Sequence, residues 1–285
     1  MKYDNNIYRP PSEAYTLLLQ VTSGCSHNKC TYCNMYKDVH FKTETLEQIE
    51  KDLIEAKSFY SHGKRIYLLN GDPFILGTDK LKAIAQLVKK HLPNCETISM
   101  YASINSIKNK SIEELKELRA LGINDLYVGI ETGNDEALNH VNKGNTSNEA
   151  FEQLNKLNEA HIDFISIIMY GIAGHNKGLV NALDTAKLLN SVKSKVVALM
   201  NLTLIPGTGL YKEALKGDFS EAFELEKLIE VKTLIENLDL KSDTIFSSVH
   251  ISNLAALNGT LPKDKQLFIN KLEAAIKDMK NTSAN

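Results

Sequence analysis

Hydrophobic and polar residues follow two different periods along this chain. Short apolar runs predict buried strands, and longer segments with apolar positions three and four residues apart predict amphipathic helices. The predicted strands are 16–21, 65–70, 97–102, 125–130, 164–170 and 195–205. The predicted helices are 45–59, 79–91, 112–121, 148–160, 179–191, 220–237 and 266–279.

The order of these elements predicts an α/β fold. Strand–helix alternation repeated about six times implies a parallel sheet with helices outside it. The run Ile165–Met169 is apolar on both faces, as expected for a parallel strand. Periodicity alone leaves open whether the sheet closes partly into a barrel. We expect a core over residues 1–237 and a C-terminal extension over 238–285, with a loop at 253–265 and one terminal helix.

Composition narrows the class of protein. The formal net charge is −2, and only three of the 33 basic residues are arginine, which argues against a dedicated nucleic-acid surface. No uncharged apolar stretch reaches the roughly 20 residues of a membrane-spanning helix. The N-terminal residues 1–11 lack the apolar segment of a signal peptide. We therefore expect a cytoplasmic protein without membrane or nucleic-acid partners.

The cysteines indicate a metal site. Three of the four lie within one short loop after the first predicted strand: Cys25, Cys30 and Cys33. Three thiolates can hold a [4Fe–4S] cluster and leave one iron for an external ligand. Alternatively, His27 or His40 would complete a Cys₃His zinc site. The distant Cys95 is interpreted as a structural thiol.

With these residues in view, the chain resembles the radical S-adenosylmethionine (SAM) superfamily. That family places three cysteines after its first strand in the pattern C-x₃-C-x₂-C, with an aromatic residue before the third. Tyr32 occupies the aromatic position, and one extra residue separates Cys25 from Cys30. The resemblance implies a partial (β/α)₆ TIM-like barrel, a [4Fe–4S] cluster and bound SAM.

Ligands of parallel α/β sheets bind at the carboxyl ends of the strands, so polar groups there are candidate SAM contacts. Asn70, Gly71 and Asp72 follow the second strand and resemble the family segment that receives the SAM ammonium group. As an isolated peptide this segment is only a turn. Ser103 and Asn105 follow the third strand, where family members contact the SAM carboxylate or ribose.

The nucleoside of SAM has its own expected contacts. In the family, the backbone at the position of Tyr32 touches adenine, and a glutamate at the position of Glu131 bonds the ribose hydroxyls. Glu131 could equally cap a helix. Tyr170 begins a glycine-containing segment similar to the adenine-binding one, and Leu204 and Pro206 stand where apolar groups pack on adenine.

We expect the substrate to be a small molecule and the electron donor to be a flavodoxin or ferredoxin. The whole chain, including 8–11 and 35–37, resembles compact queuine lyases, which release a 7-deazaguanine base. Alternatives are coproporphyrinogen-oxidase-like or methylthiotransferase-like chemistry, or a zinc-stabilised binding protein. Four residues on predicted loops are candidate substrate contacts: Asp38, His175, His250 and Asn253.

Overall fold

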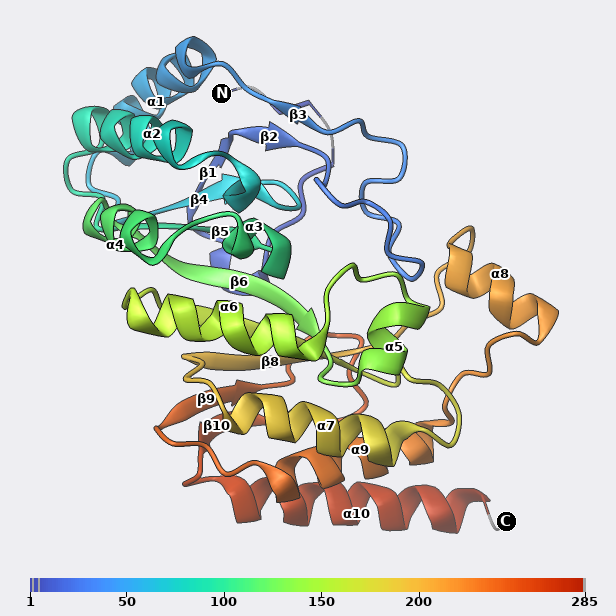
Figure 1. Ribbon diagram of the computed structural model, residues 1–285. Coiled ribbons are helices and arrows are strands. Elements are labelled where there is room, and N and C mark those ends of the chain that lie inside the picture. The colour runs from blue at the N-terminus through green and yellow to red at the C-terminus, as the bar shows by residue number, and fades with distance from the viewer. Residues whose placement is uncertain (2, 5, 284–285) are drawn as a thin grey trace. The chain divides into compact units, whose positions relative to one another are not determined.

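The computed structural model describes residues 1, 3–4 and 6–283 and is drawn in Figure 1. The strands are β1 (Leu17–Gln20), β2 (Thr22–Ser23), β3 (Lys42–Thr43), β4 (Arg65–Leu69), β5 (Thr97–Ala102), β6 (Ile123–Glu131), β7 (Phe164–Tyr170), β8 (Val196–Asn201), β9 (Thr244–Ser247) and β10 (Asn258–Leu261). The α-helices are α1 (Leu46–Tyr60), α2 (Thr78–His91), α3 (Ile104–Lys108), α4 (Ile112–Ala120), α5 (Asp135–His140), α6 (Ser147–Glu159), α7 (Gly178–Asn190), α8 (Gly209–Lys216), α9 (Glu224–Asn237) and α10 (Lys265–Ser283).

One mostly parallel sheet organises the fold. Its strand order is β1–β4–β5–β6–β7–β8–β9–β10, and β2 pairs separately with β3. The pairs β1–β4, β4–β5, β5–β6, β7–β8 and β8–β9 are parallel, and only the final β9–β10 pair is recorded as antiparallel in this sheet. Since β1 and β10 stand at opposite ends of the order, the sheet is open. The predicted α/β class with a partial barrel is confirmed.

The chain divides into two compact units. The first comprises residues 1–28, 35–129 and 156–164, and it contains β1, β4, β5 and most of β6. Its core includes the fully buried Leu19, Leu68 and Met100, and α1 packs against α2. Thr45 accepts a hydrogen bond from the Gln48 amide and so caps the start of α1.

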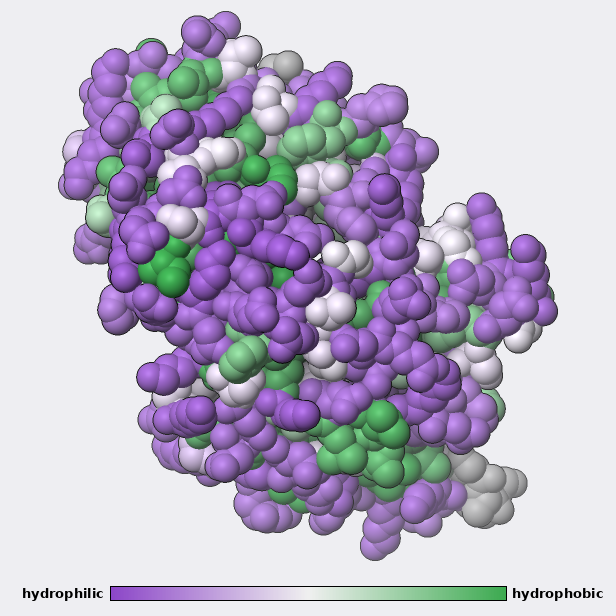
Figure 2. All heavy atoms as spheres, in the orientation of Figure 1, coloured by the Kyte–Doolittle hydropathy of each residue, from purple (hydrophilic) through white to green (hydrophobic). Residues whose placement is uncertain are grey.

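The second unit comprises residues 29–34, 130–155 and 165–285, with β7 to β10 and the helices α7, α9 and α10. Helix α9 packs against both α7 and α10, as the lower part of Figure 1 shows. Helix α7 exposes Leu179, Val180 and Leu183. Figure 2 shows a hydrophobic patch in the region of this helix.

The C-terminal tail departs from its prediction. It was expected to be helical with a loop at 253–265, but it also supplies β9 and β10, and β9 continues the parallel sheet beside β8. Strand β10 was not predicted, because Asn258–Leu261 is mostly polar and an edge strand does not need an apolar run. The predicted strand 195–205 ends at Asn201, and the helix predicted from 220 begins at Glu224. The predicted domain boundary at 238 stays a prediction.

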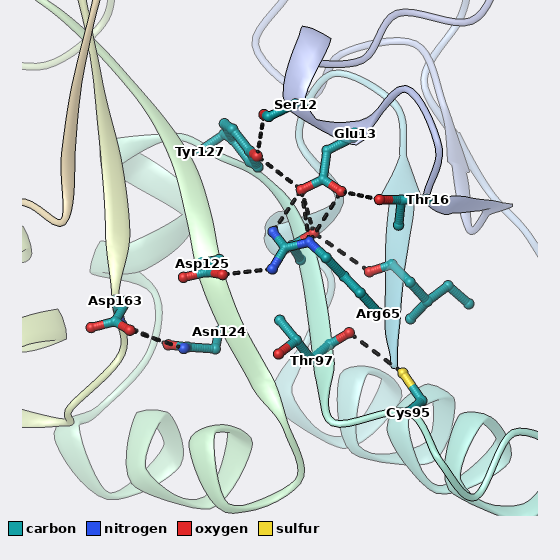
Figure 3. Close-up of polar contacts among 12 residues, drawn as sticks. Ser12, Glu13, Thr16, Arg65, Cys95, Thr97, Asn124, Asp125, Tyr127 and Asp163 are labelled. Atoms are coloured by element: carbon teal, nitrogen blue, oxygen red, sulfur yellow. Dashed lines mark hydrogen bonds and ion pairs between the residues drawn. The ribbon is translucent and has the colours of Figure 1, made fainter. Parts of the chain in front are cut away.

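A buried ionic network in the first unit lies at the amino ends of the strands (Figure 3). Glu13 is only 1% exposed and accepts hydrogen bonds from Arg65 Nη2 at 2.6 Å and from the Tyr127 hydroxyl at 2.8 Å. Arg65 Nη1 also donates to Asp125 at 2.6 Å. In sheets of this kind, residues at the amino ends of strands usually serve stability, and ligand chemistry is found at the opposite ends.

Within the described part of the chain, none of the helices is long and apolar enough to cross a membrane.

Candidate functional site

In the first unit, the end of β4 lies directly against Cys25. The Gly71 amide donates to the Gly24 carbonyl at 3.1 Å. A Cβ atom added at Gly71 would lie 2.8 Å from Cβ of Cys25 and 2.9 Å from the Tyr36 ring. Such contacts are too short for carbon atoms, so only glycine permits this packing. Gly71, which the sequence analysis places in the expected SAM-binding segment, thus also makes room for the cysteine loop.

Asp72 is a buried carboxylate held by serine hydroxyls. Its Oδ2 accepts hydrogen bonds from Ser26 Oγ at 2.7 Å and Ser103 Oγ at 2.8 Å, and its Oδ1 accepts from the Ser103 amide at 3.2 Å. Burial raises the pKa of Asp72, although the hydrogen bonds from Ser26, Ser103 and Ser106 oppose that rise. A cationic group bound beside Asp72 would favour its ionised form.

The other candidates in this unit are already engaged with the protein. Asn70 is buried, and its Nδ2 donates to the Thr22 carbonyl at 2.6 Å. Ser103 caps α3 by accepting from the Ser106 amide at 3.0 Å while it bonds Asp72. Asn105 lies half-buried in the first turn of α3. Ser103 thus positions Asp72, and Asn70 fixes the strand end.

Lys110, which the sequence analysis missed, lies near Asp72. Its Nζ donates to the Phe74 carbonyl at 2.6 Å and stands 4.5 Å from the centre of the Phe74 ring. Burial lowers the pKa of Lys110 to about 8, and the charge of Asp72 opposes this. Lys110 lies in the short polar turn between α3 and α4, which gives no sequence signal of this burial.

In the second unit, Tyr32, Glu131 and Lys143 form one contact group. Lys143 Nζ lies 2.6 Å from Glu131 Oε1, and both side chains are largely buried. Burial, followed by the nearby charges of Glu131, Cys30 and Cys33, raises the pKa of Tyr32 well above its usual value. The phenol is therefore protonated and lies near the Glu131 carboxylate. The strand-end carboxylate predicted to bind ribose thus lies within reach of the cysteine loop.

The backbone at Glu131 is also unusual. Its φ angle is 68°, in the left-handed region that non-glycine residues seldom adopt. Such conformations persist only where the surroundings hold them, and they concentrate at functional positions.

Backbone hydrogen bonds fix residues 29–34 within the same unit. The Thr31 amide donates to the Val141 carbonyl at 3.0 Å, and the Thr31 carbonyl accepts from the Leu210 amide at 2.9 Å. Asn142 Nδ2 donates to the Lys29 carbonyl at 3.3 Å. The segment 141–143 therefore binds the cysteine loop through two residues and Glu131 through the third.

Tyr32 also packs on an apolar cluster that could receive an aromatic ring. The buried members of the cluster are Ala137, Val141, Ile172, Leu202, Leu210 and Phe219, and Leu204 packs against it from the side. Pro206 is exposed outside this cluster. The structure thus brings Tyr32 and Leu204 to one apolar surface and leaves Pro206 away from it.

Tyr170 is directed toward the C-terminal tail. Its hydroxyl accepts a hydrogen bond from the Leu254 amide at 3.0 Å, and burial raises its pKa to about 12. Tyr170 also stands beside Asn201 in the β7–β8 register. Its side chain therefore fixes the tail, and an adenine contact is left to the neighbouring backbone.

The four substrate candidates differ in their surroundings. Asp38 is exposed on its loop. His175 Nδ1 pairs with Glu226 Oε2 at 2.9 Å, and His250 Nδ1 pairs with the Ser252 hydroxyl at 2.8 Å. Only Asn253 combines burial with a fixed bond to a strand of the sheet.

A buried polar relay on α9 was also missed. Glu230 accepts hydrogen bonds from the Gly171 amide at 3.0 Å and from Asn181 Nδ2 at 2.7 Å, and Asn181 Oδ1 accepts from Thr132 at 2.6 Å. Burial raises the pKa of Glu230 to about 7. The signal was available, because Lys227 and Glu230 occupy the apolar stripe of the predicted helix. The relay connects the segment after Glu131 with the end of β7.

The donor set of the loop fits an iron–sulfur cluster. Cys25, Cys30 and Cys33 remain as partly buried thiols rather than disulfides. Among the described residues, the buried hydroxyls of Ser23 and Thr31 have no hydrogen-bond partner, and both flank these cysteines in sequence. Cluster sulfurs accept such hydrogen bonds. The described residues contain no group of three His, Cys, Asp or Glu side chains arranged for a single metal ion.

The family model described as the radical SAM superfamily matches residues 19–207. The chain belongs to the radical SAM superfamily. Membership confirms the cofactor pair expected from the sequence, a [4Fe–4S] cluster and SAM, and favours the cluster over the zinc alternative.

The chain is also similar in sequence to two heme chaperones. The chain is 26% identical over 200 residues to the heme chaperone HemW of Bacillus subtilis and 24% identical over 240 residues to that of Buchnera aphidicola. These matches cover 68% and 81% of this chain and 52% and 60% of the relatives. The chain thus spans about half to three fifths of the relatives' length.

Among solved structures, coproporphyrinogen III oxidase (HemN) from Escherichia coli is similar with a TM-score of 0.57 and 16% identity. The match covers 78% of this chain and 51% of that one. At this identity the likeness supports the fold only.

Proposed function

We propose that this chain is an enzyme that holds a [4Fe–4S] cluster through Cys25, Cys30 and Cys33 and cleaves SAM reductively. The observation that carries the proposal is the strand-end Glu131, which pairs with Lys143 of the segment that also bonds the cysteine loop at Thr31. When bound, the cluster supplies the electron that breaks the S–C5′ bond of SAM, and the resulting 5′-deoxyadenosyl radical removes hydrogen from a substrate.

The chain's own residues bind and orient SAM. Asp72 is placed to accept hydrogen bonds from the SAM ammonium group, because Ser26 and Ser103 hold its carboxylate in one orientation. Glu131 would accept hydrogen bonds from the ribose hydroxyls, and Lys143 orients its carboxylate. The apolar surface around Tyr32 and Leu204 suits adenine. Such preorganisation matters because a radical displaced by about an ångström would react elsewhere.

Two small-molecule substrates follow from different observations. The sequence resemblance favours queuine, whose cleavage would release a 7-deazaguanine base. The names of the relatives, a heme chaperone and coproporphyrinogen III oxidase, favour a tetrapyrrole. Two of the three arginines are committed to the protein, Arg65 to Glu13 and Arg119 to the His161 carbonyl, so tetrapyrrole carboxylates would depend on lysines and the exposed Arg9.

An anaerobic turnover assay tests the proposal. Protein reconstituted with iron and sulfide is incubated with SAM and dithionite, or with reduced flavodoxin or ferredoxin as the proposed physiological donor. Queuine and coproporphyrinogen III are added separately, and 5′-deoxyadenosine is measured. We expect formation that increases with one of them. Purified protein that holds zinc, takes up no iron and forms no 5′-deoxyadenosine would contradict the proposal and favour the zinc-stabilised binding protein.

Heme titration adds a second readout for the tetrapyrrole candidate. A saturable change in the heme absorption spectrum, without 5′-deoxyadenosine formation from SAM in the presence of either substrate, would favour carriage of a tetrapyrrole over catalysis.

A further inference from the structure

Two asparagines at the end of β8 present oxygens without partners. Asn201 is the last residue of β8, and Asn253 lies in the loop after β9. Among the described residues, Asn201 Oδ1 and Asn253 Oδ1 are buried and accept no hydrogen bond. Buried acceptors of this kind are rare in folded proteins because desolvation without compensation is unfavourable.

The orientation of both amides is fixed by their nitrogen atoms. Asn201 Nδ2 donates to the Ser252 carbonyl at 3.0 Å, and Asn253 Nδ2 donates to the Leu199 carbonyl at 2.7 Å. Rotating either amide would place its oxygen against a carbonyl oxygen. Each side chain therefore offers an acceptor, and the pair is matched by a ligand that carries N–H donors.

The position of the pair is that of a substrate site. Asn201 stands beside Tyr170 in the parallel β7–β8 register, at the carboxyl ends of these strands. The Tyr170 hydroxyl accepts from the Leu254 amide, which immediately follows Asn253. The carboxyl ends are where parallel α/β folds bind their ligands.

The loop that carries Asn253 has an inverted distribution of polarity. At its tip Val249 and Ile251 are 60% and 97% exposed, while the polar Ser252 and Asn253 lie partly buried beneath. At its base, the Ser248 amide donates to the Leu257 carbonyl at 2.8 Å. A loop closed at its base, with polar groups facing the sheet, is typical of a segment that covers a polar ligand.

We propose that Asn201 and Asn253 recognise N–H groups of the substrate, and that residues 248–257 move to admit it. Both oxygens are buried in the present arrangement, so the loop opens for entry. When it closes, the bonds to the Ser252 and Leu199 carbonyls re-form and keep both oxygens as acceptors. This inference rests on the proposed function, of which it names the substrate chemistry. The amino edge of a 7-deazaguanine base and the pyrrole N–H groups of a porphyrinogen both fit that chemistry.

Binding without reductant tests the inference separately from catalysis. Reconstituted protein with SAM is titrated anaerobically with queuine, with its analogue lacking the exocyclic amino group, and with coproporphyrinogen III. If the base is the ligand, queuine should bind about 10-fold more tightly than the analogue, since the analogue leaves a buried acceptor unpaired. In Asn201→Ala or Asn253→Ala that ratio should fall toward 1, and the ratio is insensitive to easier opening of the loop. If the porphyrinogen is the ligand, the same variants should weaken its binding about 10-fold.

Asn190→Ala is the matched control, because both amide atoms of Asn190 bond the backbone, at Asn237 and Asp239. Its binding of queuine and the porphyrinogen should equal that of the parent. Wild-type protein that binds queuine and its analogue equally, with porphyrinogen affinity unchanged in both variants, would overturn the inference. Variants that weaken only SAM would also overturn it, since the acceptors would then serve SAM. The wild-type comparison of queuine with its analogue requires no variant to fold.

Discussion

Lys143 Nζ lies 2.6 Å from Oε1 of Glu131, and both side chains are largely buried. The segment that carries Lys143 begins at Val141, whose carbonyl accepts from the amide of Thr31 in the cysteine loop. A single short segment therefore holds the metal-binding loop and orients the carboxylate proposed to bind SAM.

Glu131→Gln should weaken SAM binding about 10- to 150-fold, because it removes a charge-assisted hydrogen bond to the ribose. Lys143→Gln should weaken it by a smaller factor, since Glu131 keeps its charge and loses only its orienting partner. The double variant should lose less than the product of the two factors, because the residues act together. Isothermal titration with SAM on iron-loaded protein measures all three.

The exposed ion pair between Lys177 and Glu136 is the control for this experiment. Glu136→Gln should leave SAM affinity unchanged, since exposed pairs contribute little. Equal SAM affinity in the parent and Glu131→Gln would mean that Glu131 serves only the protein's own structure.

The cysteine loop should account for the bound iron. Anaerobic reconstitution should give about four irons per chain, with broad visible absorption from sulfur-to-iron charge transfer. Cys25→Ala, Cys30→Ala and Cys33→Ala should each abolish it. Cys95→Ala should retain the iron, because Cys95 is distant in sequence from the three loop cysteines. Its thiol donates instead to the Thr97 carbonyl at 3.4 Å (Figure 3). Loss of iron in Cys95→Ala, or retention in the other three, would disprove the assignment.

The close contact at Gly71 gives a steric prediction. Gly71→Ala would place a methyl group 2.8 Å from Cβ of Cys25 and should displace the first cysteine of the loop. Iron content after reconstitution should fall severalfold while circular dichroism keeps its helical signal. Gly77→Ala is the matched control, since nothing lies within 4 Å of a Cβ added there. Full iron content in both variants would show that the loop adjusts.

Much of this fold was predictable from the sequence, for identifiable reasons. Strands 97–102 and 164–170 were predicted with their observed bounds, because continuous apolar runs are a strong signal for parallel strands. The Ser-x-x-Glu pattern at Ser111 and Glu114 indicates a capping box, and this box forms at the start of α4. The strand β10 escaped because its four residues include a glycine and two polar side chains at the sheet edge.

The candidate site was predictable in part. The cysteines and strand-end residues could be located by spacing, but their partners could not. Lys143 is 12 residues from Glu131, and Asn201 is 51 residues from Ser252, so only tertiary packing pairs them. Nor could spacing show that the side chain of Asn70 is committed to Thr22.

The network around Glu13 predicts how stability depends on pH. Burial tends to raise the pKa of Glu13, but Arg65, Thr16 and Tyr127 outweigh it and leave the pKa below the ordinary 4.5. A carboxyl whose pKa is lower in the folded state stabilises the fold above its unfolded pKa, and that contribution is lost as pH falls through the folded value. At pH 7, Glu13→Gln should therefore lower the free energy of unfolding by about 3 kcal/mol, because Arg65 loses a buried partner and retains only Asp125.

Urea titration of iron-free protein at several pH values measures this. The difference from the parent should shrink as pH falls below 4.5. The control Glu117→Gln breaks only the exposed pair with Lys82 and should leave stability close to that of the parent. A Glu13→Gln effect that is the same at pH 7 and below pH 4 would show that Glu13 contributes by packing and not by charge.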